Sequence, residues 1–458
     1  DHRFGGLSHP PMPCSDIAVP EETRTMVDRR SRWRSKSLRL PAIVLAALLS
    51  LILTGPLGAQ TPIGLPFQVN QDIDGGQFQA NVASNGQGRA LVAWRSPGLR
   101  GRVLDSSGRF LSPEQVLVPN RLDAFDVAMQ PDGDFLVVWD RSLFGVSARL
   151  FNADGTPKNE ILSLHPDASF PTVSVGPDGR FIVAYQIPLF LQFSEVRTRR
   201  LDAEGRPEGA ETVIGIGAGS EVVATSDGGF IVAWIYNDPS FTLTHEVRLR
   251  RFNAADEPLG PDPQVINGDP DDGILRDVSV VSAPGGFAVV WAGDKIAPDR
   301  ALTARRFGLD GVATGPPVEL DRFVNPPVTR IYRLDAAYDE EGRLVATWEI
   351  DDEVFAQGLA PGTDTPEPKA QIDLGKDVFN GASYVAALGK GRFLVAFQSG
   401  ISLGDDDDIA SIQAQRLVVS DLFRDGFESG DVLAWSQVTG SNGCPLASCR
   451  FAGGPQHD

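Results

Sequence analysis

Seven positions recur just before the apolar part of a repeated strand, and four of them hold carboxylates. The four are Asp126, Glu221, Asp277 and Asp335, and the other three positions hold Asn81, Thr172 and Ser383. If these strands surround one channel, the side chains form a polar collar that can bind a ligand. Two carboxylates at a suitable separation are also what a glycosidase needs. The alternative is that these side chains only hydrogen-bond the backbone where the strands begin.

A second acidic feature is a run of four aspartates expected in a loop of the last repeat. The run is Asp405, Asp406, Asp407 and Asp408. Carboxylate oxygens on flexible loops are ligands for calcium, so calcium is the candidate cofactor. The spacing matches no EF-hand, because the glycine and the distal glutamate are missing. A solvated acidic loop is the alternative.

Signatures of other reactions are missing from the sequence. There is no Gly-x-Ser-x-Gly elbow, phosphate loop or His-Glu-x-x-His helix. His165 and His245 are the only histidines between positions 60 and 450, and both are expected at the surface. No catalytic residue is therefore assigned. The sequence leaves open whether the protein is an enzyme, and it favours a protein without catalytic activity.

A repeated unit must position these side chains. Two clear copies are Val127–Trp139, VAMQPDGDFLVVW, and Val173–Tyr185, VSVGPDGRFIVAY. Asp-Gly favours the tight turn of a β-hairpin, and the apolar strand after it lacks alternation, as expected for a strand buried on both faces. Each such strand closes on an aromatic residue expected to pack between blades. The closing aromatics are Trp94, Trp139, Tyr185, Trp234, Trp291, Trp348 and Phe397.

Each unit continues with a third strand and a short fourth strand. The third strands carry an arginine column, Arg102, Arg149, Arg199, Arg250 and Arg305, which we expect to pair between blades. The fourth strands are expected at 115–118, 160–164, 211–216, 264–267, 318–321 and 371–374. The seventh unit lacks one, and an unattached segment of that type stands at Pro66–Asn70. We therefore predict an all-β fold, a seven-bladed β-propeller with four antiparallel strands per blade, whose last blade is closed by the N-terminal strand.

The ends of the chain differ from this body. Residues 1–25 are interpreted as upstream sequence without structure, and residues 26–59 as a signal peptide with a basic segment, the apolar run Ala42–Leu53 and a small-residue cleavage site. An uncleaved N-terminal anchor is the alternative. The propeller is expected over residues 60–419. Residues 420–458 form a tail in which Cys444 and Cys449 could form a local disulfide in an oxidising compartment.

Over about residues 64–419 the repeat resembles the tandem repeats of β-propellers in predicted secreted bacterial proteins. Residues 425–436, DGFESGDVLAWS, resemble a C-terminal segment that recurs in exported Gram-negative proteins. These resemblances imply a fold and an extracellular or periplasmic address, and they imply no activity.

Charge narrows the range of partners. The chain holds 60 acidic and 41 basic residues, a net charge of −19, so we expect it to repel nucleic acid. We expect a monomer without a membrane span after signal cleavage, secreted or held at the surface or in the periplasm of a Gram-negative-type bacterium. The preferred hypothesis is a non-catalytic scaffold whose loop-rich acidic face binds a protein or a glycan. The alternative is a carbohydrate-active hydrolase or lyase with a carboxylate site at the channel mouth.

Overall fold

The computed structural model describes residues 60–72, 76–142, 144–189, 193–237, 245–267, 275–294, 300–323, 332–350, 353–373, 379–401 and 409–419. The chain divides into two compact units, Asp1–Gly55 and Pro56–Asp458, and every described residue lies in the second. None of these ranges contains a helix able to cross a membrane. The predicted signal peptide, the tail with Cys444 and Cys449, and the run Asp405–Asp408 lie outside the described residues.

Five sheets contain four antiparallel strands each. They are β2 (Phe78–Ser84), β3 (Arg89–Ser96), β4 (Gly98–Asp105) and β5 (Gln115–Val118); β6 (Phe125–Met129), β7 (Phe135–Arg141), β8 (Gly145–Phe151) and β9 (Leu162–His165); β17 (Leu275–Ala283), β18 (Gly286–Asp294), β19 (Arg300–Gly308) and β20 (Val318–Phe323); β21 (Tyr332–Tyr338), β22 (Leu344–Ile350), β23 (Glu353–Leu359) and β24 (Ala370–Gln371); and β25 (Phe379–Gly389), β26 (Arg392–Ile401), β27 (Ile409–Val419) and β1 (Gln60–Gln68). The sixth sheet has seven strands, β10 (Ser169–Val175), β11 (Phe181–Pro188), β12 (Ser194–Leu201), β13 (Pro207–Ala224), β14 (Phe230–Asn237), β15 (His245–Phe252) and β16 (Pro258–Val265).

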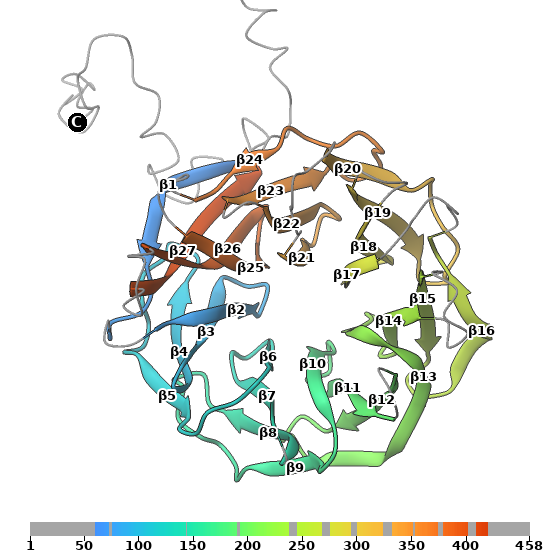
Figure 1. The fold of residues 1–458 in the computed structure, drawn as a ribbon, viewed down its shortest axis with the longest axis horizontal. Coiled ribbons are helices and arrows are strands. Elements are labelled where there is room, and N and C mark those ends of the chain that lie inside the picture. Colours follow the sequence, from blue (N-terminus) through green and yellow to red (C-terminus); the bar gives the residue numbers. More distant parts are fainter. Residues whose placement is uncertain are drawn as a thin grey trace, which may run out of the picture. The chain divides into compact units, whose positions relative to one another are not determined.

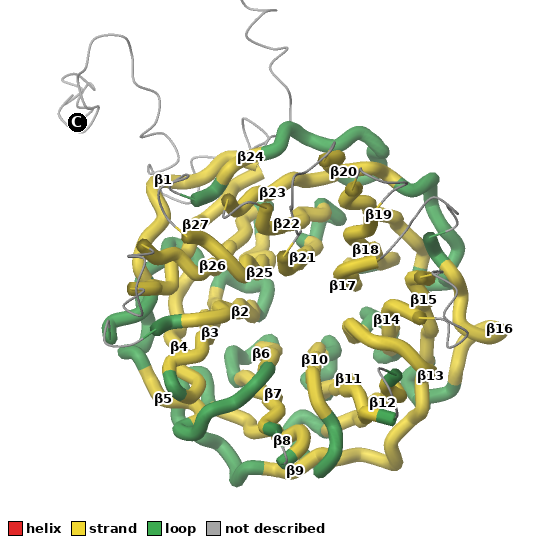
Figure 2. The backbone as a smooth tube through the Cα atoms, viewed as in Figure 1, coloured by secondary structure: helices red, strands yellow, loops and turns green. Residues whose placement is uncertain are grey.

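The sheets are arranged around a common centre as the blades of a β-propeller (Figure 1). The innermost strands β2, β6, β10, β13, β17, β21 and β25 contact one another in succession, and β25 contacts β2. Figure 2 shows loops joining strands and no helix in the described part of this unit. The all-β propeller predicted from the sequence is therefore present.

One strand serves two positions in this arrangement. The first half of β13 pairs with β12 and its second half pairs with β14, so β13 is outermost beside one strand and innermost beside the next. The fourth strand expected at 211–216 is present as part of the first half of β13, and its continuation into the next innermost strand was not expected. Gly217 permits the continuous strand, because a Cβ there would lie 2.4 Å from both the Ile235 carbonyl oxygen and Trp234 Cδ1.

Smaller differences concern strand ends. The strands expected at 160–164, 264–267 and 371–374 are observed as Leu162–His165, Pro258–Val265 and Ala370–Gln371. His245 begins β15, where it pairs with Asn237.

The Asp-Gly turns form as predicted. In the β6–β7 hairpin the Asp132 carboxylate accepts a hydrogen bond from the Asp134 backbone N–H at 3.0 Å. Gly133 has φ of 100°, and Gly179 and Gly228 have φ of 81° and 84° at the matching places. These φ values are in the region that favours glycine, which explains the residue type at the turn.

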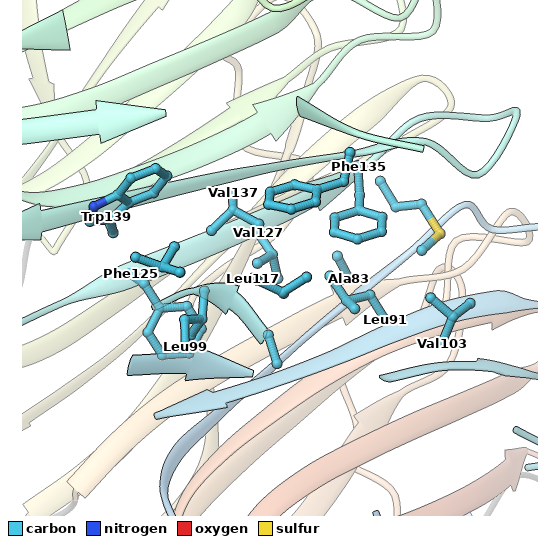
Figure 3. Packing of buried hydrophobic residues seen from close by; sticks show 14 of the residues in the cluster. Ala83, Leu91, Leu99, Val103, Leu117, Phe125, Val127, Phe135, Val137 and Trp139 are labelled. Atoms are coloured by element: carbon cyan, nitrogen blue, oxygen red, sulfur yellow. The ribbon is translucent and has the colours of Figure 1, made fainter. Parts of the chain in front are cut away.

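The hydrophobic core is divided into clusters that lie between neighbouring sheets. Figure 3 shows one of them, in which Leu99 and Leu117 of one sheet pack against Phe125, Phe135 and Trp139 of the next. The closing aromatics predicted to pack between blades are all buried, with exposed fractions of 0 to 6%. They therefore serve packing between sheets and form no exposed stacking platform.

Three of the five arginines in the column bond between sheets. Arg149 instead donates to the Asn159 carbonyl of its own unit, and Arg199 lies 3.8 Å from Glu211 of its own sheet. Arg102, Arg250 and Arg305 donate from Nη1 to the carbonyls of Val69, Ile214 and Ile266, at 3.0, 3.2 and 3.1 Å. Each carbonyl belongs to an outer strand, or the residue after one, of the preceding unit. The guanidinium groups of Arg250 and Arg305 also lie over the rings of Phe252 and Phe307, at 5.6 Å to each centroid. The column is thus structural.

The N-terminal strand joins the end of the repeat. β1 pairs antiparallel with β27, with Pro62 opposite Leu417 and Phe67 opposite Ala414. Beyond the strand, Asn70 Oδ1 accepts the Ile412 N–H at 2.8 Å. Asn267 makes the same contact to Val247 at 2.7 Å, after the fourth strand of another unit. The N-terminal segment therefore occupies the place of a fourth strand.

We predict that Asn70→Ala lowers the free energy of unfolding by about 1–3 kcal/mol, because the buried Ile412 N–H loses its acceptor. Asn267→Ala is the matched control, since it removes the same contact elsewhere in the ring. Urea denaturation of the three proteins measures both effects. If Asn267→Ala destabilises the protein and Asn70→Ala does not, β1 is not docked in solution.

Candidate functional site

Three collar aspartates join the innermost strand of one sheet to that of the next. Asp126 on β6 accepts the Val173 N–H of β10 at 2.7 Å, and Asp277 on β17 accepts the Leu334 N–H of β21 at 3.0 Å. Asp335 on β21 accepts the N–H of Val385 on β25 at 2.8 Å. The backbone role that the sequence left as an alternative is thus filled by these three carboxyl groups.

The same residues lie in a ring of mutually repelling carboxyl groups. Burial raises the pKa of Asp126 to about 6, although hydrogen bonds from Val173, Val127 and Asn81 oppose the shift. Burial likewise raises the pKa of Asp335 to about 7, against the backbone bonds of Val385 and Ala336, while the charges of Asp126 and Asp277 add to the rise. Burial also raises the pKa of Asp277. The side chains keep partial solvent exposure, so they line the ring where water still reaches them.

Glu221 differs from the three aspartates. Among the described residues its carboxyl group has no hydrogen-bond partner, whereas each aspartate accepts a backbone N–H. Burial raises the pKa of Glu221 well above its usual value, and the charges of Asp126, Asp335 and Asp277 raise it further. Glu221 is therefore the collar carboxyl left available to a ligand.

Arg333 brings a positive charge to this ring. It lowers the pKa of Glu221 and of Asp277, so its guanidinium lies within electrostatic reach of both carboxyl groups. In the described part of the chain it forms no ion pair within 4.0 Å, and its hydrogen bond is a long one of 3.4 Å to the Tyr384 hydroxyl. Burial raises the pKa of Tyr384, which keeps that hydroxyl protonated. Arg333 and Tyr384 are site residues that the sequence reasoning missed.

Backbone bulges occur near the start of four innermost strands, two residues before a collar position. Gln79, Phe170, Gly219 and Arg333 each stand two residues before a collar position, and their φ values are 48°, 50°, 58° and 49°. The register of the first hairpin shifts at each of these places. Bulges redirect side chains, and left-handed backbone is costly for residues other than glycine. Phe170 is 60% exposed there, beside the strand that carries Glu221.

The residues two positions before the collar could have been found from the sequence. Counting two positions back from each collar residue gives an arginine and a phenylalanine among smaller or uncharged residues. The bulge itself leaves no such pattern, because no residue type at these positions requires it.

The other candidates from the sequence do not join this site. The run Asp405–Asp408 is outside the described residues, so calcium binding there stays a prediction. Asp72, an acidic residue after β1, is bound at 3.1 Å by Arg100, which also binds Glu114. Within the described ranges no group of three or more His, Cys, Asp or Glu residues is placed to hold a metal ion.

No family model matches the chain, and no curated protein matches it. Among solved structures, the chain is similar to a protein of unknown function from Dyadobacter fermentans, with 13% identity, a TM-score of 0.46 and coverage of 80% of this chain and 100% of that one. It is also similar to the β-propeller domain of the trilobed protease from Pyrococcus furiosus, with 7% identity, a TM-score of 0.46 and coverage of 76% and 96%. A third is an α-L-arabinanase from Penicillium chrysogenum, complexed with arabinobiose, with 14% identity, a TM-score of 0.44 and coverage of 64% and 93%.

The raised pKa values predict how stability depends on pH. Because Asp126 and Asp335 have a higher pKa in the folded state than in the unfolded chain, the folded state binds more protons between about pH 4 and pH 7. The free energy of unfolding contributed by these groups is therefore present near pH 4 and is lost as the pH rises to about 7. Urea denaturation from pH 4.5 to 8 measures this slope.

The variants Asp126→Asn and Asp335→Asn should each make that slope shallower, whatever they do to stability at a single pH. Asp178→Asn is the control, because its side chain is 47% exposed on a hairpin turn. A slope that is unchanged in both collar variants would show that these carboxyl groups titrate normally.

Proposed function

We propose that the protein is an exported, non-catalytic seven-bladed β-propeller that binds a glycan at the mouth of its central ring. The blade number follows from counting β13 in two blades, one ending with it and one beginning with it. Seven hydrophobic clusters among the described residues, each between neighbouring units, support the same count. The export address rests on the interpretation of residues 26–59.

The observation that carries the binding proposal is the pair Glu221 and Arg333. One is a carboxyl group and the other a guanidinium, they lie within electrostatic reach, and they form no ion pair with each other. A carboxyl group that lacks a donor and a guanidinium that holds only a long bond to Tyr384 are suited to a ligand that both donates and accepts hydrogen bonds. Vicinal hydroxyl groups of a sugar do both.

The exposed ring of Phe170 supports a sugar over a purely polar ligand. Ligand sites combine apolar surface with a few convergent polar groups, and an aromatic ring can cover the C–H face of a pyranose or furanose. Phe170 is held in left-handed backbone with φ of 50°, and it is 60% exposed. Strained backbone of this kind is concentrated at functional sites.

A carbohydrate-active enzyme is the second candidate, because Asp126 and Asp335 have the raised pKa values that acid catalysts need. Both carboxyl groups already accept backbone N–H groups that join neighbouring sheets. Glu221 alone is free of such bonds among the four, and a glycosidase needs two carboxyl groups. The arrangement therefore favours binding over turnover.

We expect a glycan array to identify a ligand for the mature protein, and calorimetry to show weaker binding by the site variants. Glu221→Gln and Arg333→Lys should each weaken binding at least tenfold, the second because lysine keeps the charge and loses the planar fork of donors. Phe170→Ala should weaken it by removing the apolar platform. Glu208→Gln is the control, since Glu208 lies at the outer end of β13.

Three outcomes would contradict the proposal. They are the absence of any bound glycan, affinity that survives both Glu221→Gln and Arg333→Lys, and release of shortened sugars during the assay. The last would identify the protein as a hydrolase or lyase. If a secreted protein binds at the same residues and no glycan does, the binding site is correct but the proposed class of ligand is wrong.

A further inference from the structure

A pocket of about 240 Å³ lies at the hairpin turns that end three of the innermost strands. Its lining consists of Asn85, Gly86 and Gln87 after β2, Tyr338, Asp339 and Glu340 after β21, and Ala387 and Gly389 at the end of β25. The turn residue Asp339 stands four positions beyond the collar residue Asp335, so at about 3.3 Å per residue the pocket is roughly 13 Å from the collar. It is thus distinct from the proposed glycan site and does not depend on it.

Asp339 is the buried polar residue of this pocket, with 2% of its surface exposed. Its Oδ1 atom holds the hairpin turn by accepting the N–H groups of Glu341 and Arg343, at 3.0 and 2.8 Å. Its Oδ2 atom is buried and has no hydrogen-bond partner among the described residues. A buried acceptor without a donor is costly and calls for an explanation.

The same position in other hairpins shows what such a side chain does. Gln130 donates from Nε2 to the carbonyls of Gly179 and Ala203 in the neighbouring unit, at 2.7 and 2.9 Å. Asn85 donates from Nδ2 to the Pro131 carbonyl of its neighbour at 3.3 Å. Both are amides that supply a donor to the next unit. Asp339 stands at this position with a carboxyl group, so it offers an acceptor where Gln130 and Asn85 offer a donor.

The neighbouring hairpin is also shorter at this place. β21 and β22 are joined by five residues between the paired Tyr338 and Leu344. β25 and β26 are joined by Lys390 and Gly391 alone, with φ of 57° and 67°, between the paired Gly389 and Arg392. The pocket occurs where this shorter turn faces the longer one.

We propose that this pocket binds a small organic cation through an ammonium group that donates a hydrogen bond to Asp339 Oδ2. The pocket lining includes a second carboxylate, Glu340, and no lysine or arginine side chain. An ammonium group carries three donors, which suits a wall of carboxyl and carbonyl oxygens. A metal ion fits less well, because no described group of three or more acidic, His or Cys residues is placed to hold one.

The test uses n-butylammonium as the probe and n-butanol as its uncharged match, with the mature protein followed by calorimetry and amide NMR. We expect the ammonium to bind at least tenfold more tightly than the alcohol and to shift the amide signals of Gly86 and Gly389. Asp339→Asn should reduce ammonium affinity at least tenfold, because the amide has a donor where the oxygen was. Asp178→Asn, which changes a carboxylate on a hairpin turn away from the pocket, should leave the affinity unchanged.

Equal binding of the alcohol, or unchanged affinity in Asp339→Asn, would overturn the proposal. Calcium that binds more tightly than the ammonium and shifts the same amides would also overturn it in favour of a metal site. If Asp339→Asn does not fold, the comparison of ammonium, alcohol and calcium on the unaltered protein still decides between these results. Glu340→Gln then provides the second variant, with reduced ammonium affinity expected.

Discussion

Each sheet in this protein has two apolar faces, and most of that surface can be removed from water only by packing against a neighbouring sheet. Leu91 and Phe135 belong to different sheets and to the same buried cluster, as Ala90 and Leu394 do at the junction where the chain's ends meet. Hydrophobic burial of this kind is the main favourable contribution to folding. The first and last sheets therefore pack against each other, and β1 completes the last sheet by pairing with β27.

Closure has an electrostatic consequence at the centre. It brings the innermost strands together, and the backbone N–H groups at their starts need acceptors because they face the ring. Asp126, Asp277 and Asp335 supply these acceptors across neighbouring strands, at the cost of crowding carboxyl groups in partly buried surroundings. Their raised pKa values are the result. Arg333 offsets part of this repulsion and remains without an ion pair among the described residues. The need for acceptors of these backbone N–H groups and the candidate binding site thus both result from bringing the innermost strands together.

The sequence predicted the parts of the fold that repeat, because each has a local physical cause. Asp-Gly requires a hairpin turn with positive φ, a strand without alternation must be buried on both faces, and Pro66–Asn70 has the pattern of a fourth strand. The collar residues were found for the same reason. The roles of the collar residues could not be predicted, because the choice between binding a ligand and hydrogen-bonding the backbone depends on distances between sheets.

Features that break the repeat could not be predicted in this way. The bulges before Thr172 and Asp335 depend on how a strand end meets its neighbour. β13 changes its pairing partner at Gly217, where a Cβ would lie 2.4 Å from Trp234 Cδ1. The pocket beside Asp339 arises from the mismatch of two hairpin lengths. Such features belong to pairs of units, whereas the sequence pattern describes one unit at a time.

The central claim is that closing the ring places a set of carboxyl groups in partly buried, mutually repelling positions. Carbon-13 NMR titration of the aspartate carboxyl groups in the intact mature protein tests it most directly, with Asp126→Asn and Asp335→Asn used for assignment. The account predicts midpoints near 6 for Asp126 and near 7 for Asp335. Midpoints near the ordinary value of about 4 for both residues would contradict it.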